Sequence, residues 1–322
     1  MAKTIEQFRG IALVTHEACL DHDTGAHHPE RADRLRSVLA ALNAERFPEL
    51  LREQAPRARA EQLIRVHDGD YVRPLLALEV PAGEHIALDP DTILSAGSVE
   101  AALRAAGGAI RGVDLVMEGK ADAGFVAARP PGHHAEPAKG MGFCLFNSIA
   151  IAAHHARDRW GLKRIAVADF DVHHGNGTQA AFWDDAELFF ASSHQGPFYP
   201  GTGSREERGV SGNIANVPLA SGTGSIGFRK AWRDELLPAL DSFAPELLLI
   251  SAGFDAHRDD PLAGLLLDEA DYSWITGELV ALAHRHCNGR VVSLLEGGYD
   301  LDALASCVAA HVKALEQASQ PL

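Results

Sequence analysis

Short, solidly apolar segments alternate with amphipathic segments along most of this sequence. The apolar runs lie at 11–15, 123–128, 164–170, 188–193, 214–218, 246–253 and 290–297. Strands that lack polar alternation are typical of a parallel sheet whose two faces are both covered by helices. The pattern therefore predicts an α/β protein, a three-layer α/β/α sandwich around a mainly parallel sheet.

The segments between these runs carry helical patterns. We expect helices near 97–118, 146–160, 225–240, 269–286 and 301–316. A further helix is expected to open at His28-Pro29-Glu30, because proline is favoured in the first turn. No tandem repeat or Pro/Gly/Ser-rich linker divides the chain. We therefore expect residues 1–322 to form a single domain.

The balance of charged residues limits which kinds of molecule the protein is expected to bind. Lys and Arg total 29 against 44 for Asp and Glu, a net charge of −15. This balance argues against direct binding of nucleic acid and allows a cationic substrate. The first residues, MAKTIEQFRG, lack the apolar core of a signal peptide, and no segment resembles a membrane span. The four cysteines form no CxxC pair, so we expect reduced thiols and a cytoplasmic location.

Polar and titratable groups follow four of the apolar runs directly. RPPGHH comes after 123–128, DFDVHHGN continues the run at 164–168, AGFDAH follows 246–251, and EGGYD follows 290–295. Ligands of open parallel sheets bind beyond the carboxyl ends of the strands. We therefore expect these groups to meet at one edge of the sheet.

Three of these residues have the chemistry of a catalytic metal site. Asp171 and His173 share one side of an extended segment, and Asp255 follows another strand. One imidazole and two carboxylates suit Zn²⁺ or Fe²⁺ and leave a coordination position open for water. A buried Asp–His hydrogen-bond network is the alternative for any single pair, but two such clusters at neighbouring strand ends favour a metal.

Groups for proton transfer and charge stabilisation lie beside the predicted metal ligands. Pro130, Pro131 and Gly132 place His133 and His134 in a tight turn directly after a strand, as general acid–base chemistry requires. Asp169 and Asn176 can each accept a ring N–H from these histidines. Tyr299 follows two glycines, and its phenol could donate to a developing oxyanion.

Five ordered motifs resemble the zinc-dependent histone deacetylase family, in particular its class II branch with bacterial amidohydrolases and polyamine deacetylases. They are RPPGHHAE (129–136), GFCLFN (142–147), DFDVHHGNGT (169–178), SAGFDAH (251–257) and LEGGY (295–299). The resemblance begins at HHPERADRL (27–35) and covers nearly the whole chain. It implies an arginase/deacetylase fold and a metal-activated water that removes an acyl group from an amine.

The resemblance also implies roles for individual residues. Zinc would be held by Asp171, His173 and Asp255, and the proton-transfer and oxyanion groups would be His133, His134, Asp169, Asn176 and Tyr299. Asn at 176, where much of the family has Asp, should leave His134 less basic. Gly142, Phe143 and Tyr199 would line a narrow substrate channel. A structural K⁺ would use Asp169, Asp171, His173, Ser192 and Ser193, and Arg31 matches an arginine near an inner acetate pocket.

Other functions remain open from the sequence. A binuclear manganese ureohydrolase such as arginase shares the implied fold, but His174 and Asn176 supply no bridging carboxylates. An acyl-lysine-binding module without turnover is the alternative from another class. Within the deacetylases, the substrate could be an acetylated lysine peptide or an acetylated polyamine, with Asp89 and Asp91 at the rim of the site. A homo-oligomer is compatible with the sequence.

Overall fold

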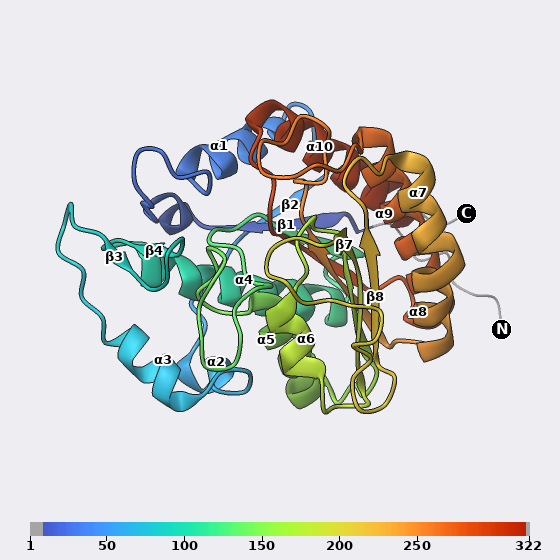
Figure 1. Ribbon diagram of the computed structural model, residues 1–322, viewed down its shortest axis with the longest axis horizontal. Helices are drawn as coiled ribbons and strands as arrows, with labels where there is room; N and C mark the ends of the chain where they lie inside the picture. The colour runs from blue at the N-terminus through green and yellow to red at the C-terminus, as the bar shows by residue number, and fades with distance from the viewer. Residues whose placement is uncertain (1–8, 320–322) are drawn as a thin grey trace.

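Eight strands form one sheet in which every pairing is parallel (Figure 1). The computed structural model describes residues 9–319. The spatial order is β2-β1-β5-β10-β9-β6-β7-β8. The strands are β1 (Ile11–Thr15), β2 (Leu51–Gln54), β5 (Ala123–Val126), β6 (Ile165–Asp169), β7 (Leu188–Gln195), β8 (Ile214–Leu219), β9 (Leu247–Ala252) and β10 (Val291–Leu295).

Helices cover both faces of this sheet, which confirms the predicted α/β/α sandwich (Figure 1). One layer holds α4 (Ser98–Met117), α5 (Ser148–Trp160) and α6 (Asn176–Phe182). The other holds α1 (Ala32–Ala41), α7 (Ser225–Ala231), α8 (Leu237–Phe243), α9 (Glu269–His286) and α10 (Leu301–Ser319). None of the helices within residues 9–319 is long and apolar enough to cross a membrane.

The structure contains several elements that the sequence pattern did not predict. They are η1 (Glu17–Leu20), β2, α2 (Ala60–Leu63), α3 (Gly69–Leu76), the β3–β4 hairpin (Ile86–Ala87 with Ile93–Leu94) and α6. Most of them are short. Strand β2 reads LREQ, and no residue of it is fully buried. A polar edge strand of this kind is specified by pairing with its neighbour rather than by hydrophobic periodicity.

One predicted helix boundary is wrong. Helix α1 begins at Ala32, so Pro29 lies outside it. Glu30 also lies before the helix, and its fully buried carboxylate accepts hydrogen bonds from Arg129 at 2.5 and 2.6 Å. The helix expected over 225–240 is present, with a π-helical turn, η2 (Trp232–Leu236), between α7 and α8.

The four strands that precede the polar motifs lie side by side at the centre of the sheet, in the order β5-β10-β9-β6. All four are parallel, so their carboxyl ends open at the same edge. The side chains that follow them must therefore converge there, as the sequence predicted.

Two helical glycines provide a test of how α4 packs. A Cβ at Gly107 would lie 1.9 Å from the backbone oxygen of Pro56, whereas a Cβ at Gly277 in α9 would meet nothing within 4 Å. Alanine gains roughly 1 kcal/mol over glycine in helix propensity. We expect Gly277→Ala to raise stability by up to about 1 kcal/mol. Gly107→Ala should lower it by about 1–3 kcal/mol, the range for overpacking.

Chemical denaturation of both variants measures this difference directly. An increase in the free energy of unfolding for Gly107→Ala would show that the chain around Pro56 yields without cost, and would contradict the packing described here.

Candidate metal centre and active site

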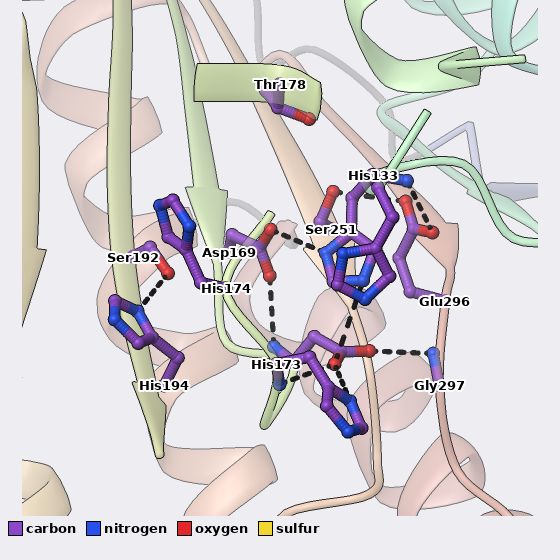
Figure 2. Close-up of polar contacts among 12 residues, drawn as sticks. His133, Asp169, His173, His174, Thr178, Ser192, His194, Ser251, Glu296 and Gly297 are labelled. Atoms are coloured by element: carbon purple, nitrogen blue, oxygen red, sulfur yellow. Dashed lines mark hydrogen bonds and ion pairs between the residues drawn. The ribbon is translucent and has the colours of Figure 1, made fainter. Parts of the chain in front are cut away.

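The predicted metal ligands meet beyond β6 and β9. Asp171, His173 and Asp255 are all buried, and one ligand atom from each lies within 4.8 Å of the others. Nδ1 of His173 lies 3.2 Å from Oδ1 of Asp171 and 3.1 Å from Oδ2 of Asp255. The structure thus brings together the three residues that the sequence assigned to the zinc site, and Figure 2 shows His173 with its polar contacts.

Backbone groups hold the remaining carboxylate oxygens. The N–H of Gly297 donates to Oδ2 of Asp171 at 2.8 Å, and that of Val172 donates to Oδ1 of Asp255 at 2.9 Å. A Cβ at Gly297 would lie 2.1 Å from Oδ2 of Asp255, so only glycine fits there. One oxygen of each carboxylate is left facing the imidazole nitrogen. This donor set fits a divalent metal of the Zn²⁺ or Fe²⁺ kind.

A second cluster of ligand-type side chains is less suited to a metal. His257, Glu269 and Cys307 also have ligand atoms within 4.8 Å of one another. However, Nδ1 of His257 already accepts the N–H of Asp259 at 3.2 Å, and Glu269 is exposed. Nε2 of His257 lies 3.9 Å from Glu269.

The two histidines of the RPPGHH turn lie together with their expected partners. Nδ1 of His133 is 3.0 Å from Oδ2 of Asp169, and Nδ1 of His134 is 2.8 Å from Oδ1 of Asn176. The two ring centroids are 4.1 Å apart. The turn itself is fixed by Glu296, which accepts the N–H of Gly132 at 2.7 Å.

The surroundings of the two rings shift their pKa values in opposite directions. Burial disfavours a positive charge on either ring. At His133, however, the carboxylates of Asp171 and Asp169 outweigh the effect of burial and raise the pKa of this ring to about 10. Burial, together with the positive charges of His133 and His173, holds the pKa of His134 well below its usual value. Within the polypeptide, these surroundings favour a positive charge on His133 and a neutral His134.

Glu136 orients the base through Asn176, a contact that the sequence did not reveal. The carboxylate of Glu136 accepts the Asn176 amide N–H at 2.8 Å, which turns Oδ1 of Asn176 toward His134. His134 must then donate through Nδ1, leaving the lone pair on Nε2. The Glu136 carboxylate thus acts on His134 through Asn176.

A cavity of about 260 Å³ opens above these groups. It is lined by Asp91, His134, Gly142, Phe143, His173, Tyr199, Leu262 and Tyr299. A Cβ at Gly142 would lie 2.5 Å from the His134 ring, so the chain approaches the base closely only because this residue is glycine. The predicted wall residues Gly142, Phe143 and Tyr199 all line the cavity, whereas Leu262 was not predicted.

Two aromatic rings beside the cavity lie against the histidines. Phe198, which the sequence did not single out, stacks on His173 with ring centroids 5.3 Å apart. Tyr199 makes an edge contact with His134 at 5.2 Å. The predicted loop thus supplies a pair of rings, and the one that stacks on the predicted metal ligand His173 is Phe198.

Tyr299 reaches the cavity from the end of β10. Its ring lies 5.8 Å from that of Phe143, and the guanidinium of Arg34 lies over it at 4.8 Å from the centroid. Arg34 is fully buried. Arg31, the arginine assigned to an inner pocket by resemblance, is instead exposed and pairs with Asp33 at 3.7 Å. On helix α1 the i+3 position faces inward, so Arg34 occupies the interior.

The residues expected around K⁺ lie at the ends of β6 and β7. Asp169 pairs in register with Ser192, so these two residues are neighbours across the sheet. The Ser192 hydroxyl contacts Nδ1 of His194 at 2.9 Å, and the Ser193 hydroxyl accepts the Trp232 indole N–H at 2.9 Å (Figure 2 shows the first contact). The serine side chains therefore already have protein partners.

Comparisons with known proteins agree with this geometry. The histone deacetylase domain model matches residues 28–315. The chain is 39% identical to a probable deacetylase of Archaeoglobus fulgidus, over 90% of this chain and 81% of that protein. It is also 39% identical to the histone deacetylase-like amidohydrolase of Pseudomonas aeruginosa, over 95% and 86%.

A solved structure shows the same architecture. The crystal structure of the HDA15 HD domain is 35% identical and aligns with a TM-score of 0.88, covering 98% of this chain and 90% of that chain. The family model spans residues 28–315, and the two relatives named above are matched over 81% and 86% of their own length. The chain therefore belongs to the histone deacetylase family.

Proposed function

We propose that this protein is a metal-dependent deacetylase that hydrolyses the amide of an acetylated amine, either an acetyl-lysine side chain or an acetylated polyamine. One observation carries the proposal. The cavity of about 260 Å³ places His134 and Tyr299 against the same buried space as the metal ligand His173. A general base, an oxyanion donor and a metal centre are the groups that amide hydrolysis by water requires.

The metal-ligand set is Asp171, His173 and Asp255. When bound there, Zn²⁺ supplies an acidified water and polarises the scissile carbonyl. His134 takes the proton of the attacking water at Nε2, since Nδ1 is committed to Asn176. His133, kept cationic by Asp169 and Asp171, adds positive charge beside the developing oxyanion. The Tyr299 phenol donates to that oxygen, and His134 then returns the proton to the leaving amine.

Aromatic side chains form part of the channel wall. Phe143 and Tyr199 both line the cavity, and their rings are rigid. Asp91 lies half-buried at the same cavity. Its carboxylate is suited to accept hydrogen bonds from a peptide backbone or to pair with an ammonium group. This is why both substrate classes stay within the proposal.

Two further functions are less well supported by the geometry. A binuclear manganese ureohydrolase needs additional ligands at the site, but His174 contacts Thr202 at 2.8 Å and Gln179 at 3.0 Å. Asn176 is committed to His134. A binding module without turnover would have no use for a polarised base beside the metal ligands.

The proposal also includes a structural K⁺, which would lie near Asp169, Asp171, His173, Ser192 and Ser193. It further includes a cytoplasmic location. Asp169 and Asp171 are fully or almost fully buried, and a second cation close to them would offset part of the cost of their charges.

Turnover of a defined substrate set tests the proposed function. Acetyl-lysine peptides, acetylputrescine, acetylcadaverine and acetylspermidine are incubated with the zinc-loaded protein, and free acetate is measured. We expect acetate from at least one class. The absence of acetate from all of them, with the metal shown to be bound, would refute the proposal.

Removing one carboxylate ligand tests the metal site. Replacing Asp171 or Asp255 by Asn should remove bound metal and nearly all activity, because only three protein ligands are present. Metal content is measured on the purified protein by elemental analysis. The matched control is Glu269→Gln in the second cluster, which should keep its metal. Full metal retention in Asp255→Asn would contradict the assignment, as would loss of the metal in Glu269→Gln.

Removing the phenolic O–H of Tyr299 tests the oxyanion donor. Tyr299→Phe keeps the ring and its contacts with Arg34 and Phe143 but removes the O–H. Such a donor acts mainly in the transition state, so its loss should lower kcat by about 10²–10³-fold and change KM little. Metal content and Tm should stay near those of the wild type. A kcat close to the wild-type value would refute the role of Tyr299.

A further inference from the structure

One carboxylate joins two loops that both contribute to the cavity wall. Asp260, on the loop between β9 and α9, accepts the N–H of Leu262 at Oδ1 and 2.9 Å. Its Oδ2 accepts the N–H of Tyr299 at 2.8 Å, across 39 residues of sequence. Leu262 and Tyr299 both line the cavity. Asp260 itself does not line it, so any effect on chemistry must act through these two neighbours.

The backbone before Tyr299 has little conformational restraint of its own. Two glycines precede the tyrosine, and Gly298 has φ +120°, a region that other residues rarely adopt. External contacts must therefore fix the turn. Arg34 donates to the carbonyls of Gly298 and Glu296, each at 2.5 Å. These bonds hold the chain on the side before Tyr299, and the Asp260 bond holds the N–H of Tyr299 itself.

Keeping a carboxylate at this place is costly. Asp260 is only 7% exposed, and burial together with the charge of Asp255 raises its pKa to about 7. The carboxylate's partners in the hydrogen-bond network are backbone N–H groups rather than a cationic side chain. Such bonds give directional restraint without neutralising the charge. The neighbouring Asp259 differs sharply, since its side chain is 67% exposed.

We propose that Asp260 is a positioning residue that sets the place of the Tyr299 phenol in the cavity by anchoring the Tyr299 backbone to the Leu262 loop. The inference rests on the proposed function, because the phenol is taken to be the oxyanion donor. An amide at position 260 presents one acceptor oxygen and one NH₂ group, which can only donate. It can therefore satisfy only one of the two backbone groups and must release or repel the other.

A double-mutant cycle tests whether Asp260 acts through Tyr299. Four proteins are compared in the zinc-loaded state: wild type, Asp260→Asn, Tyr299→Phe and the double variant. Misplacement of a catalytic group by about 1 Å costs up to roughly 10²-fold in rate. We expect Asp260→Asn to lower kcat by about 10- to 100-fold. In the Tyr299→Phe background the same change should lower kcat less than about threefold, because no phenol is left to misplace.

Two further variants separate geometry from charge. Asp260→Glu keeps the carboxylate but moves it by one methylene, so it should also lower kcat by about tenfold, which tests the idea even if Asp260→Asn does not fold. Asp259→Asn removes an exposed charge from the adjacent position and should behave as the wild type. Equal losses from Asp260→Asn in both backgrounds, or full activity in Asp260→Glu, would overturn the proposal.

Hydrogen exchange gives a readout that does not depend on activity. In Asp260→Asn, the peptides that contain the amides of Leu262 and Tyr299 should exchange faster, while those of β9 and β10 should not change. Unchanged exchange at Tyr299 would overturn the anchoring role even if kcat falls. If Tyr299→Phe proves fully active, the proposed oxyanion role of Tyr299 is wrong. Hydrogen exchange of the Tyr299 amide in Asp260→Asn then decides separately whether Asp260 anchors this backbone.

Discussion

The central constraint on this structure is the burial of several carboxylates at one edge of a parallel sheet. Asp169, Asp171, Asp255 and Glu296 are each no more than 1% exposed. An isolated buried carboxylate is strongly destabilising, so each must be paired, hydrogen-bonded or bound to a cation. His133 and His173 supply part of the compensation through direct contacts. Other groups of the site must compensate for the carboxylate charge that these two imidazoles do not balance.

Backbone geometry provides much of that remaining compensation, and it explains the glycines of the motifs. The N–H groups of Gly297, Val172 and Gly132 all point at buried carboxylates. At Gly253 an added Cβ would lie 1.9 Å from Oδ2 of Asp171. The main chain can come this close to an anion only where the side chain is absent. The glycines are thus part of the electrostatics of the site as well as of its turns.

The local pattern predicted the layers of the sandwich, the edge at which the site lies and the residues that gather there. Those features follow from hydrophobic runs and from the groups directly after them, such as Asp171 after β6. The contacts of Glu136, Arg34 and Asp260 were not predicted, because each joins segments far apart in the sequence. Arg34 and Gly298 are separated by 264 residues. Arg31 and Arg34 also look alike in the sequence, and only the packing of α1 shows which one faces inward.

The predicted active-site groups are spread over four strand ends, and this arrangement ties their geometry to the integrity of the sheet. A shift of β10 relative to β9 would move Tyr299 away from Asp255 and would break the Gly297 bond to Asp171 at the same time. Metal binding at Asp171, His173 and Asp255 would join the ends of β6 and β9 and so favour the native register of both. The buried charges that make the site costly are therefore also the groups through which a bound cation stabilises the fold.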